Sequence, residues 1–113
     1  MEAVELLTQA AAHAMARADQ RTFLLGAIGV RFDGARVMAR NGTSTQRTPE
    51  AHAEARLARK LDRGSVVYVA RVRCDGTWAL ARPCPRCMLR LRSRGVVRVF
   101  YTLGPGSFVS ECL

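Results

Sequence analysis

The sequence predicts an α/β domain in which helices pack in layers against a central sheet. Three observations carry this prediction: the chain has 113 residues, 49% of them are hydrophobic, and helical and strand patterns alternate along it. A chain of this length forms one compact domain, here residues 1–113, and the apolar fraction is sufficient for a core. Alternating helices and strands are typical of layered α/β packing.

The first third of the chain predicts a helix and then a strand hairpin. Apolar residues recur at helical spacing between Glu2 and Arg17. They are Val4, Leu7, Ala11, Met15 and Ala18. Residues 22–31 are rich in β-branched and aromatic side chains, and Asp33-Gly34 is typical of a hairpin turn. We therefore expect a returning strand over residues 36–40.

The middle of the chain predicts a second helix and a second hairpin. Thr48-Pro49-Glu50 has the composition of a helix start, and residues 51–62 continue as strong helix formers. Residues 65–73 alternate in a strand pattern. Asp75-Gly76 is another turn signal, so residues 77–81 should pair back against that strand.

The last third predicts a helix followed by a strand. Pro83 precedes a helix over residues 84–93, and residues 96–103 form an apolar strand pattern. Gly104-Pro105-Gly106 interrupts that strand, after which Phe108-Val109 is expected to form a short edge strand.

Charge and hydropathy limit the classes of protein that the chain can belong to. The net charge is +9, which favours phosphate-bearing or polyanionic partners, although a biased arginine-rich composition explains it equally well. The longest apolar runs, such as residues 66–70, are too short to span a bilayer. The N-terminus lacks the pattern of a signal peptide, and we expect a cytoplasmic protein.

Two of the four cysteines form a close pair, Cys84-x-x-Cys87. Without an export signal, such a pair indicates a metal or redox motif rather than a disulfide. A redox motif would require a thioredoxin-like context around the pair. The upstream His52-x-Glu54 favours a metal instead.

These residues fit an open zinc site. Catalytic zinc usually has three protein ligands and one position left for water, and His52, Cys84 and Cys87 supply three. Both cysteines fall at a predicted helix start, where backbone N–H groups and the helix dipole favour thiolate. Glu54 is then available to accept a proton from the water and to donate protons to the substrate.

The combination of His52-x-Glu54 and Pro83-Cys84-x-x-Cys87 resembles the cytidine deaminase superfamily, over about residues 23–101. The resemblance implies a three-layer α/β/α sandwich with a central mixed sheet of four to five strands. It implies Zn²⁺ bound by His52, Cys84 and Cys87, with hydrolytic deamination by zinc-bound hydroxide and Glu54 as proton shuttle. The His-Cys-Cys set is similar to the deoxycytidylate, tRNA-adenosine and polynucleotide-cytosine branches, whereas the free-cytidine branch typically uses three cysteines.

The resemblance also suggests substrate contacts. Asn41 follows the second predicted strand, where members of these branches often place an asparagine that bonds the ribose hydroxyl. Ala53 lies between His52 and Glu54 and is a further candidate substrate contact. Arg82 stands where many relatives have a glutamate before Pro-Cys, and Trp78 lies in an inserted hairpin, residues 73–81. Both are candidate substrate contacts, although a single tryptophan on a short strand more often serves packing.

The chain ends soon after the strand over residues 96–103. Ten residues remain, too few for the helix and strand that close the sheet in the parallel branches. Either the last strand returns as a tight hairpin, or the sheet lacks an edge and requires a partner subunit. Family members are often dimers or tetramers, so a homo-oligomer is expected.

Several alternatives remain open at this point. A structural zinc site would need a fourth ligand from Cys74, Cys112 or His13. The favoured function is deamination of cytosine in a nucleoside or nucleotide. A second is deamination of cytosine, or less favourably adenine, in single-stranded DNA or RNA, and a third is an inactive zinc-stabilised nucleic-acid-binding module.

Two basic faces bear on that choice. One is an arginine stripe on the third predicted helix, and the other lies on the second. The stripe comprises Arg86, Arg90 and Arg94 with Arg92 nearby, and the second face comprises Arg56, Arg59, Lys60 and Arg63. Such faces suit phosphate contacts, although solvated faces of this kind are common.

Overall fold

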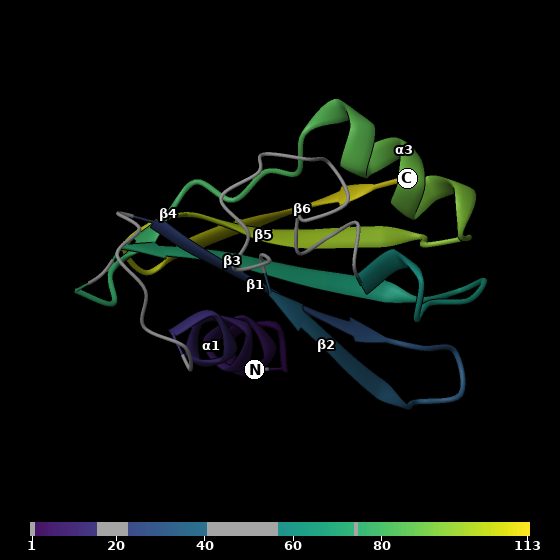
Figure 1. The fold of residues 1–113 in the computed structure, drawn as a ribbon, viewed down its shortest axis with the longest axis horizontal. Helices are drawn as coiled ribbons and strands as arrows, with labels where there is room; N and C mark the ends of the chain where they lie inside the picture. Colours follow the sequence, from purple (N-terminus) through teal and green to yellow (C-terminus); the bar gives the residue numbers. More distant parts are fainter. Residues whose placement is uncertain (1, 16–22, 41–56, 74) are drawn as a thin grey trace.

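The computed structural model describes residues 2–15, 23–40, 57–73 and 75–113 (Figure 1). None of the helices in these ranges is long and apolar enough to cross a membrane. The predicted loop over residues 41–45 and the predicted helix start at residues 48–50 lie outside them. Of the helix expected over residues 51–62, the described part is helical at residues 57–58 and continues as a turn.

A mixed sheet forms the centre of the molecule. Five strands follow one another in the order β2-β1-β3-β5-β6, and a short β4 pairs with β3 beside this path. The strands are β1 (Phe23–Val30), β2 (Arg36–Arg40), β3 (Val66–Arg73), β4 (Trp78–Ala79), β5 (Arg98–Gly104) and β6 (Ser107–Cys112). β3 and β5 are parallel, and all the other pairs are antiparallel.

Helices cover both faces of the sheet, which confirms the layered α/β/α fold. α1 (Glu2–Met15) packs on one face, and α3 (Pro85–Ser93) lies on the other together with the helical residues 57–58 (Figure 1). The five-stranded path agrees with the expected four to five strands. The additional strand, β4, belongs to the inserted hairpin.

β3 is the centre of the core because its side chains are buried on both faces. Val67 and Val69 pack with Leu57 and Leu91 on the α3 face. Tyr68, Ala70 and Val72 face α1, as alternation along a strand requires, in the cluster that also contains Leu7. This double burial explains why the strand is apolar over its whole length.

The buried face of α1 agrees with the predicted one at Leu7 and Ala11 and differs from it at Val4 and Met15, while Ala18 lies outside the described residues. Val4 and Met15 are 38% and 37% exposed. The residues that face the sheet are Ala3, Leu6, Leu7, Ala10, Ala11 and Ala14. Helical periodicity alone is ambiguous here because apolar residues lie on more than one side of the helix, and close backbone packing favours the side with the small alanines.

The C-terminal residues return as a hairpin, which decides between the two expectations for the sheet edge. β5 and β6 pair antiparallel from Arg98↔Cys112 to Gly104↔Ser107, with an irregularity near Gly104. β6 is longer than the expected Phe108-Val109. Cys112 is paired with Arg98, so β6 completes the sheet within one chain.

A prediction follows from the contact between α1 and β1. A Cβ atom on Gly26 would lie 2.2 Å from the backbone oxygen of Ala10 and 2.9 Å from the backbone nitrogen of Ala14. Because backbone atoms cannot move aside as a flexible side chain can, Gly26→Ala should lower the free energy of unfolding by about 2 kcal/mol or more. Denaturant unfolding followed by circular dichroism measures this change.

Gly104→Ala is the matched control. A Cβ atom at Gly104 would meet nothing within 4 Å, so this variant should remain within about 0.5 kcal/mol of the parent. Equal effects of the two substitutions would contradict the proposed packing of α1 on β1.

Candidate metal centre and active site

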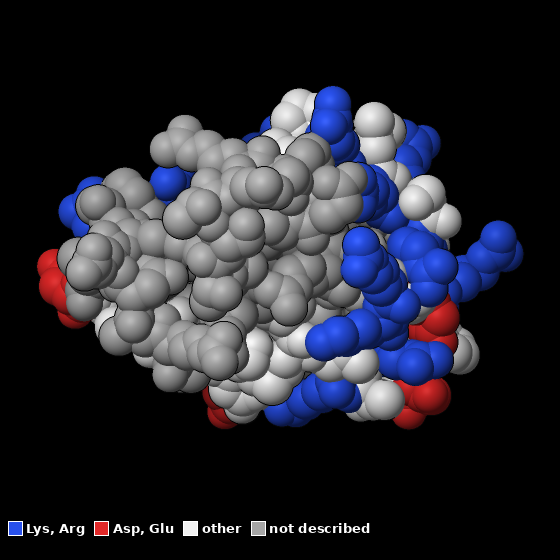
Figure 2. Space-filling view, viewed as in Figure 1, with Lys and Arg blue, Asp and Glu red and all other residues white. Residues whose placement is uncertain are grey.

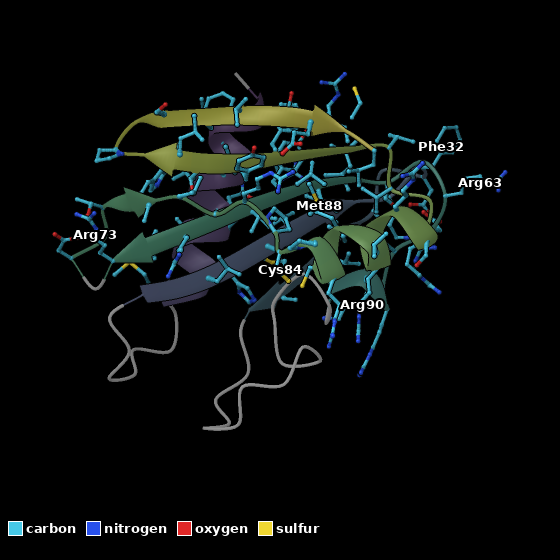
Figure 3. All side chains as sticks on the ribbon, turned by 90° about the horizontal axis from the view of Figure 1, so that it is seen from above. Phe32, Arg63, Arg73, Cys84, Met88 and Arg90 are labelled. Atoms are coloured by element: carbon cyan, nitrogen blue, oxygen red, sulfur yellow. The ribbon has the colours of Figure 1, made fainter. Side chains whose placement is uncertain are left out.

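The two cysteines of the motif lie at the beginning of α3, as the sequence predicted. Cys84 is the N-cap residue, with φ −65° and ψ 160°, and Pro85 occupies the first turn. The Cys84 carbonyl accepts a hydrogen bond from the Met88 amide at 2.9 Å. Cys84, labelled in Figure 3, is exposed and Cys87 is 1% exposed, so the pair runs from the surface into the core.

This position suits a thiophilic metal. The first amides of a helix have no intrahelical acceptors, and the helix dipole is positive at this end, so an anionic ligand atom is favoured there. Two thiolates on one turn are typical zinc donors. The donor set present at the start of α3 therefore fits zinc.

Hydrogen bonds hold the segment before Cys84 against the end of β5. The Ala81 amide donates to the Thr102 carbonyl at 2.9 Å. The buried Thr102 hydroxyl donates to the Ala79 carbonyl at 2.6 Å and accepts from the Arg71 amide at 3.2 Å. Pro83 is fully buried. The backbone that leads into the cysteine pair is thus fixed to the sheet.

An ion pair adds a second attachment, from Arg82 to the C-terminal strand. Arg82 Nε and Nη2 donate to the Glu111 carboxylate at 2.9 and 3.3 Å. The Tyr101 hydroxyl donates to the same carboxylate at 2.7 Å. We call Arg82, Glu111 and Tyr101 the Arg82 cluster. It connects the residue two before Cys84 to β5 and β6.

The hydrogen bonds of the Arg82 cluster change the ionisation of its members. Donation by Arg82, and then by Tyr101, lowers the pKa of Glu111. Loss of solvent raises the pKa of Tyr101, and the neighbouring Glu111 raises it further. Arg82 was expected to contact substrate, and that assignment stays a prediction. Neither Glu111 nor Tyr101 carries a local signal of this role, because their partnership depends on the register of β6.

Trp78 lies on β4, half-buried, and packs against the hydrophobic cluster beneath α1. α3 and its cysteines are on the other face of the sheet. This location accords with the packing interpretation that was weighed for Trp78. Its assignment as a substrate contact stays a prediction.

The described candidates for a fourth ligand lie away from α3. His13 is on α1. Cys112 pairs with Arg98. Because side chains alternate along a strand, Cys112 lies on the same face of β6 as Phe108, which packs on the α1 face. Both positions favour a site with three protein ligands over a closed structural site. Cys74, the remaining candidate, lies outside the described residues.

The other half of the motif is beyond the described ranges. His52, Glu54, Ala53 and Asn41 fall in residues 41–56, and within the described part of the chain no three His, Cys, Asp or Glu side chains form a metal-binding group. Leu57, three residues after Glu54, packs in the same cluster as Leu91 of α3. The chain that follows His52-x-Glu54 therefore enters the α3 face, where the cysteines lie.

Comparisons with known proteins agree with this fold and motif. Residues 1–103 match the model of the cytidine and deoxycytidylate deaminase zinc-binding region. The structure is similar to that of cytidine deaminase from Mycobacterium leprae, with a TM-score of 0.63, 22% identity, and coverage of 97% of this chain and 93% of the other. It is also similar to cytidine deaminase from Mycobacterium tuberculosis, with a TM-score of 0.51, 23% identity, and coverage of 89% of this chain and 84% of the other. A search of curated proteins finds no match.

The fold and the cysteine pair define the class as a deaminase-type α/β/α domain with a zinc-binding region. The chain belongs to the cytidine and deoxycytidylate deaminase family. At 22–23% identity, the structural similarity establishes the fold. The substrate therefore has to be argued from the residues of this chain.

The assignment of Cys84 as a zinc ligand predicts a specific loss of metal. Cys84 and Cys112 are both exposed, so replacing either with serine should affect the core little. Cys84→Ser should reduce zinc from one ion per chain to a small fraction, because a neutral hydroxyl is a poor substitute for thiolate. Cys112→Ser should retain full zinc. Elemental analysis of freshly purified protein measures both, and equal zinc contents would contradict the assignment.

The lowered pKa of Glu111 predicts a pH dependence of the Arg82 cluster. A carboxylate whose pKa is lower in the folded state stabilises the fold above its ordinary pKa of about 4.3. That stabilisation is lost as pH falls through the lower, folded value. Glu111→Gln should therefore unfold at a lower temperature than the parent at pH 7, and the difference should shrink below about pH 4.

Thermal unfolding of both proteins across this pH range provides the measurement. Both have the same cysteines, so acid release of zinc affects them alike. A difference that is constant down to the lowest pH would show that Glu111 acts through packing and not through its charge.

Proposed function

We propose that this chain is a zinc-dependent hydrolytic deaminase that converts cytosine to uracil in a nucleoside or nucleotide. The observation that carries the proposal is the placement of Cys84 and Cys87 at the start of α3, in a chain of the deaminase family that also contains His52-x-Glu54. Family, fold and motif support the same chemistry. The homo-oligomer and the cytoplasmic location stay predictions.

His52, Cys84 and Cys87 would hold the zinc ion. When bound, zinc supplies the Lewis acidity that makes water a nucleophile near neutral pH. Cys84 and Cys87 lie at the start of α3, where the helix dipole favours anionic ligand atoms. The hydrogen bonds from Thr102 and the Arg82 cluster hold the segment that carries Cys84, which maintains the orientation of the ligands.

Glu54 would move the protons. It would accept one proton from the attacking water and donate it to the ring nitrogen, and then accept the proton of the hydroxyl now on the ring carbon and donate it to the departing amine. A bond from oxygen to the ring carbon forms, the carbon–nitrogen bond breaks, and ammonia leaves. Asn41 would hold the sugar hydroxyl, which fixes the ring in position for attack.

Free nucleosides and nucleotides fit better than single-stranded nucleic acid. Proteins that bind single strands stack successive bases on aromatic side chains. Among the described residues, Phe32 is an exposed aromatic, at 83%. The aromatic side chains of Tyr68, Phe100 and Phe108 pack against one another in the sheet. They are not available as a platform for bases.

Replacement of Glu54 tests the proposal. Glu54→Gln should lower the rate of ammonia release from cytidine or cytidine 5′-monophosphate by about 10²- to 10⁴-fold, because it removes proton transfer. Zinc content should be unchanged, since Glu54 is not a ligand. Glu5→Gln, an exposed position on α1, is the control and should retain full activity.

The proposal fails if the zinc-loaded parent protein releases no ammonia from either compound. It also fails if Glu54→Gln is as active as the parent. Product formed only on oligonucleotides would show that the substrate is single-stranded DNA or RNA instead.

A further inference from the structure

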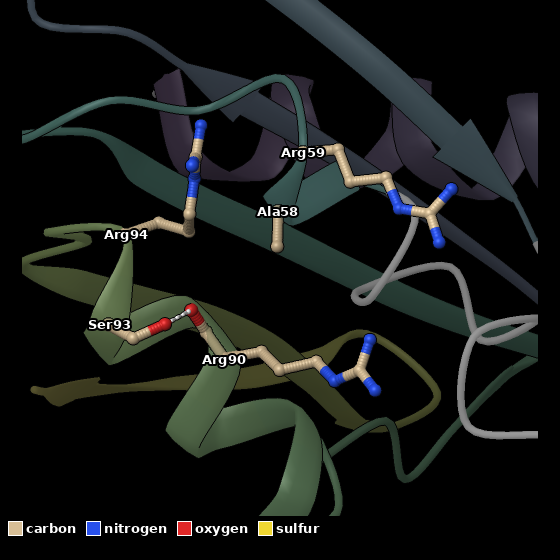
Figure 4. A pocket seen from close by; sticks show the side chains of 5 residues that line it. All are labelled: Ala58, Arg59, Arg90, Ser93 and Arg94. Carbon is tan, nitrogen blue, oxygen red and sulfur yellow. Dashed lines mark hydrogen bonds between the residues drawn. The ribbon is translucent and has the colours of Figure 1, made fainter.

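Two basic faces of the chain meet at one pocket on the surface. The pocket has a volume of about 210 Å³ and is lined by Ala58, Arg59, Arg90, Ser93 and Arg94 (Figure 4). Arg59 comes from the turn after the helical residues 57–58, and Arg90 and Arg94 come from the last part of α3. We propose that this pocket binds the phosphate group of a nucleotide.

The charge of the described lining residues favours an anion. Three of its five described lining residues are arginines and none is acidic. Arginines on opposite walls repel one another, and an anion between them converts this repulsion into attraction. Guanidinium groups match phosphate in particular, because they donate two parallel hydrogen bonds to its oxygens.

One wall of the pocket is held in place by a hydrogen bond. Arg94 Nη2 donates to the Leu61 carbonyl at 2.8 Å, which ties the end of α3 to the segment that carries Arg59. The guanidinium groups of Arg59 and Arg90 extend toward the same side in Figure 4. A ligand that enters between them would meet groups already gathered, which lowers the entropic cost of binding.

The size of the pocket limits what it can hold. Pockets that enclose whole small-molecule ligands usually have volumes of about 300–1,000 Å³. A volume of 210 Å³ is too small for a nucleotide but sufficient for a phosphate group with several waters, at about 30 Å³ per water. The remainder of the ligand would therefore lie outside this pocket.

The pocket lies along α3 from the cysteine pair. Arg90 and Arg94 follow Cys87 by three and seven residues. Residues at these spacings lie on the same side of a helix, one turn and two turns apart. At a rise of 1.5 Å per residue, these positions are about 4.5 and 10.5 Å along the axis from Cys87. Such distances are comparable to the length of a nucleotide from base to phosphate.

The surrounding surface has the same sign of charge. Figure 2 shows lysine and arginine side chains gathered toward the end of the molecule that carries α3 and residues 57–64. A local positive potential raises the rate at which phosphate-bearing ligands arrive. The pocket would add to this general attraction a defined position for one phosphate group.

The test uses zinc-loaded full-length protein and a matched pair of double variants. Arg59→Gln/Arg90→Gln removes two arginines that line the pocket. Arg36→Gln/Arg98→Gln removes two exposed arginines that are outside its lining, and both variants change the net charge from +9 to +7 (9 − 2). Calorimetric titration at constant ionic strength with inorganic phosphate, cytidine and cytidine 5′-monophosphate compares the three proteins.

We expect the pocket variant to bind phosphate and cytidine 5′-monophosphate at least about tenfold more weakly than the parent, because it loses charged hydrogen bonds. Its affinity for cytidine should not change, and the control variant should stay within about twofold for every probe, since exposed charges contribute little at moderate salt. The proposal is overturned if phosphate binds both variants equally, or if the parent binds neither phosphate nor the nucleotide.

This inference rests on the proposed function only for the link to catalysis, which a kinetic comparison addresses separately. In the pocket variant, KM should rise about tenfold or more for cytidine 5′-monophosphate and not for cytidine. An unchanged ratio of the two KM values, with phosphate affinity lost, would reject the substrate's phosphate as the ligand and assign the pocket to a separate phosphate-bearing molecule. Absence of deamination on both compounds would refute the proposed function, while the calorimetry would still test the pocket.

Discussion

The parallel pairing of β3 with β5 is the constraint on which the candidate site depends. Two adjacent parallel strands require a connection that leaves the end of the first and returns to the start of the second. Here α3 forms that connection and packs on one face of the sheet. Its N-terminal end must therefore lie near the carboxyl end of β3, the edge at which α/β sheets usually bind ligands. The position of Cys84 and Cys87 is a consequence of this topology.

The two faces of the sheet have different roles. The α1 face is a packing face, closed by small side chains and by the stacked rings of Tyr68 and Phe100, whose centroids are 4.8 Å apart. The α3 face carries Cys84 and Cys87, the Arg82 cluster and the arginine pocket. β3 contributes side chains to both faces, so a change on the packing face can reach the site through this strand.

Much of this arrangement could be predicted from the sequence where local chemistry decides the outcome. Asp33-Gly34 and Asp75-Gly76 have the composition of hairpin turns, and Gly34 and Gly76 adopt positive φ, at 90° each. The beginning of α3 followed from Pro83 and the cysteine spacing. Features that depend on pairing between distant residues were not predictable. The register of β6 brings Glu111 to Arg82, and neither residue carries a local signal of that contact.

The face of α1 and the convergence of the arginines show the same limit. An alanine-rich helix has several equivalent apolar sides, and the choice between them depends on Gly26 across the interface. Arg59 and Arg90 are 31 residues apart, and their shared pocket arises only when residues 57–60 pack beside α3. The sequence shows that each of the two predicted helices has a basic face. Only the folded structure shows that the two faces lie next to each other.

X-ray absorption at the zinc edge of the purified protein tests the central claim most directly. The account predicts one zinc ion per chain with two sulfur ligands at about 2.3 Å, one imidazole nitrogen at about 2.0 Å, and one light atom in the fourth position. That coordination sphere is open to water and suits catalysis. A shell of four protein ligands, or sulfur ligands other than two in number, would contradict it.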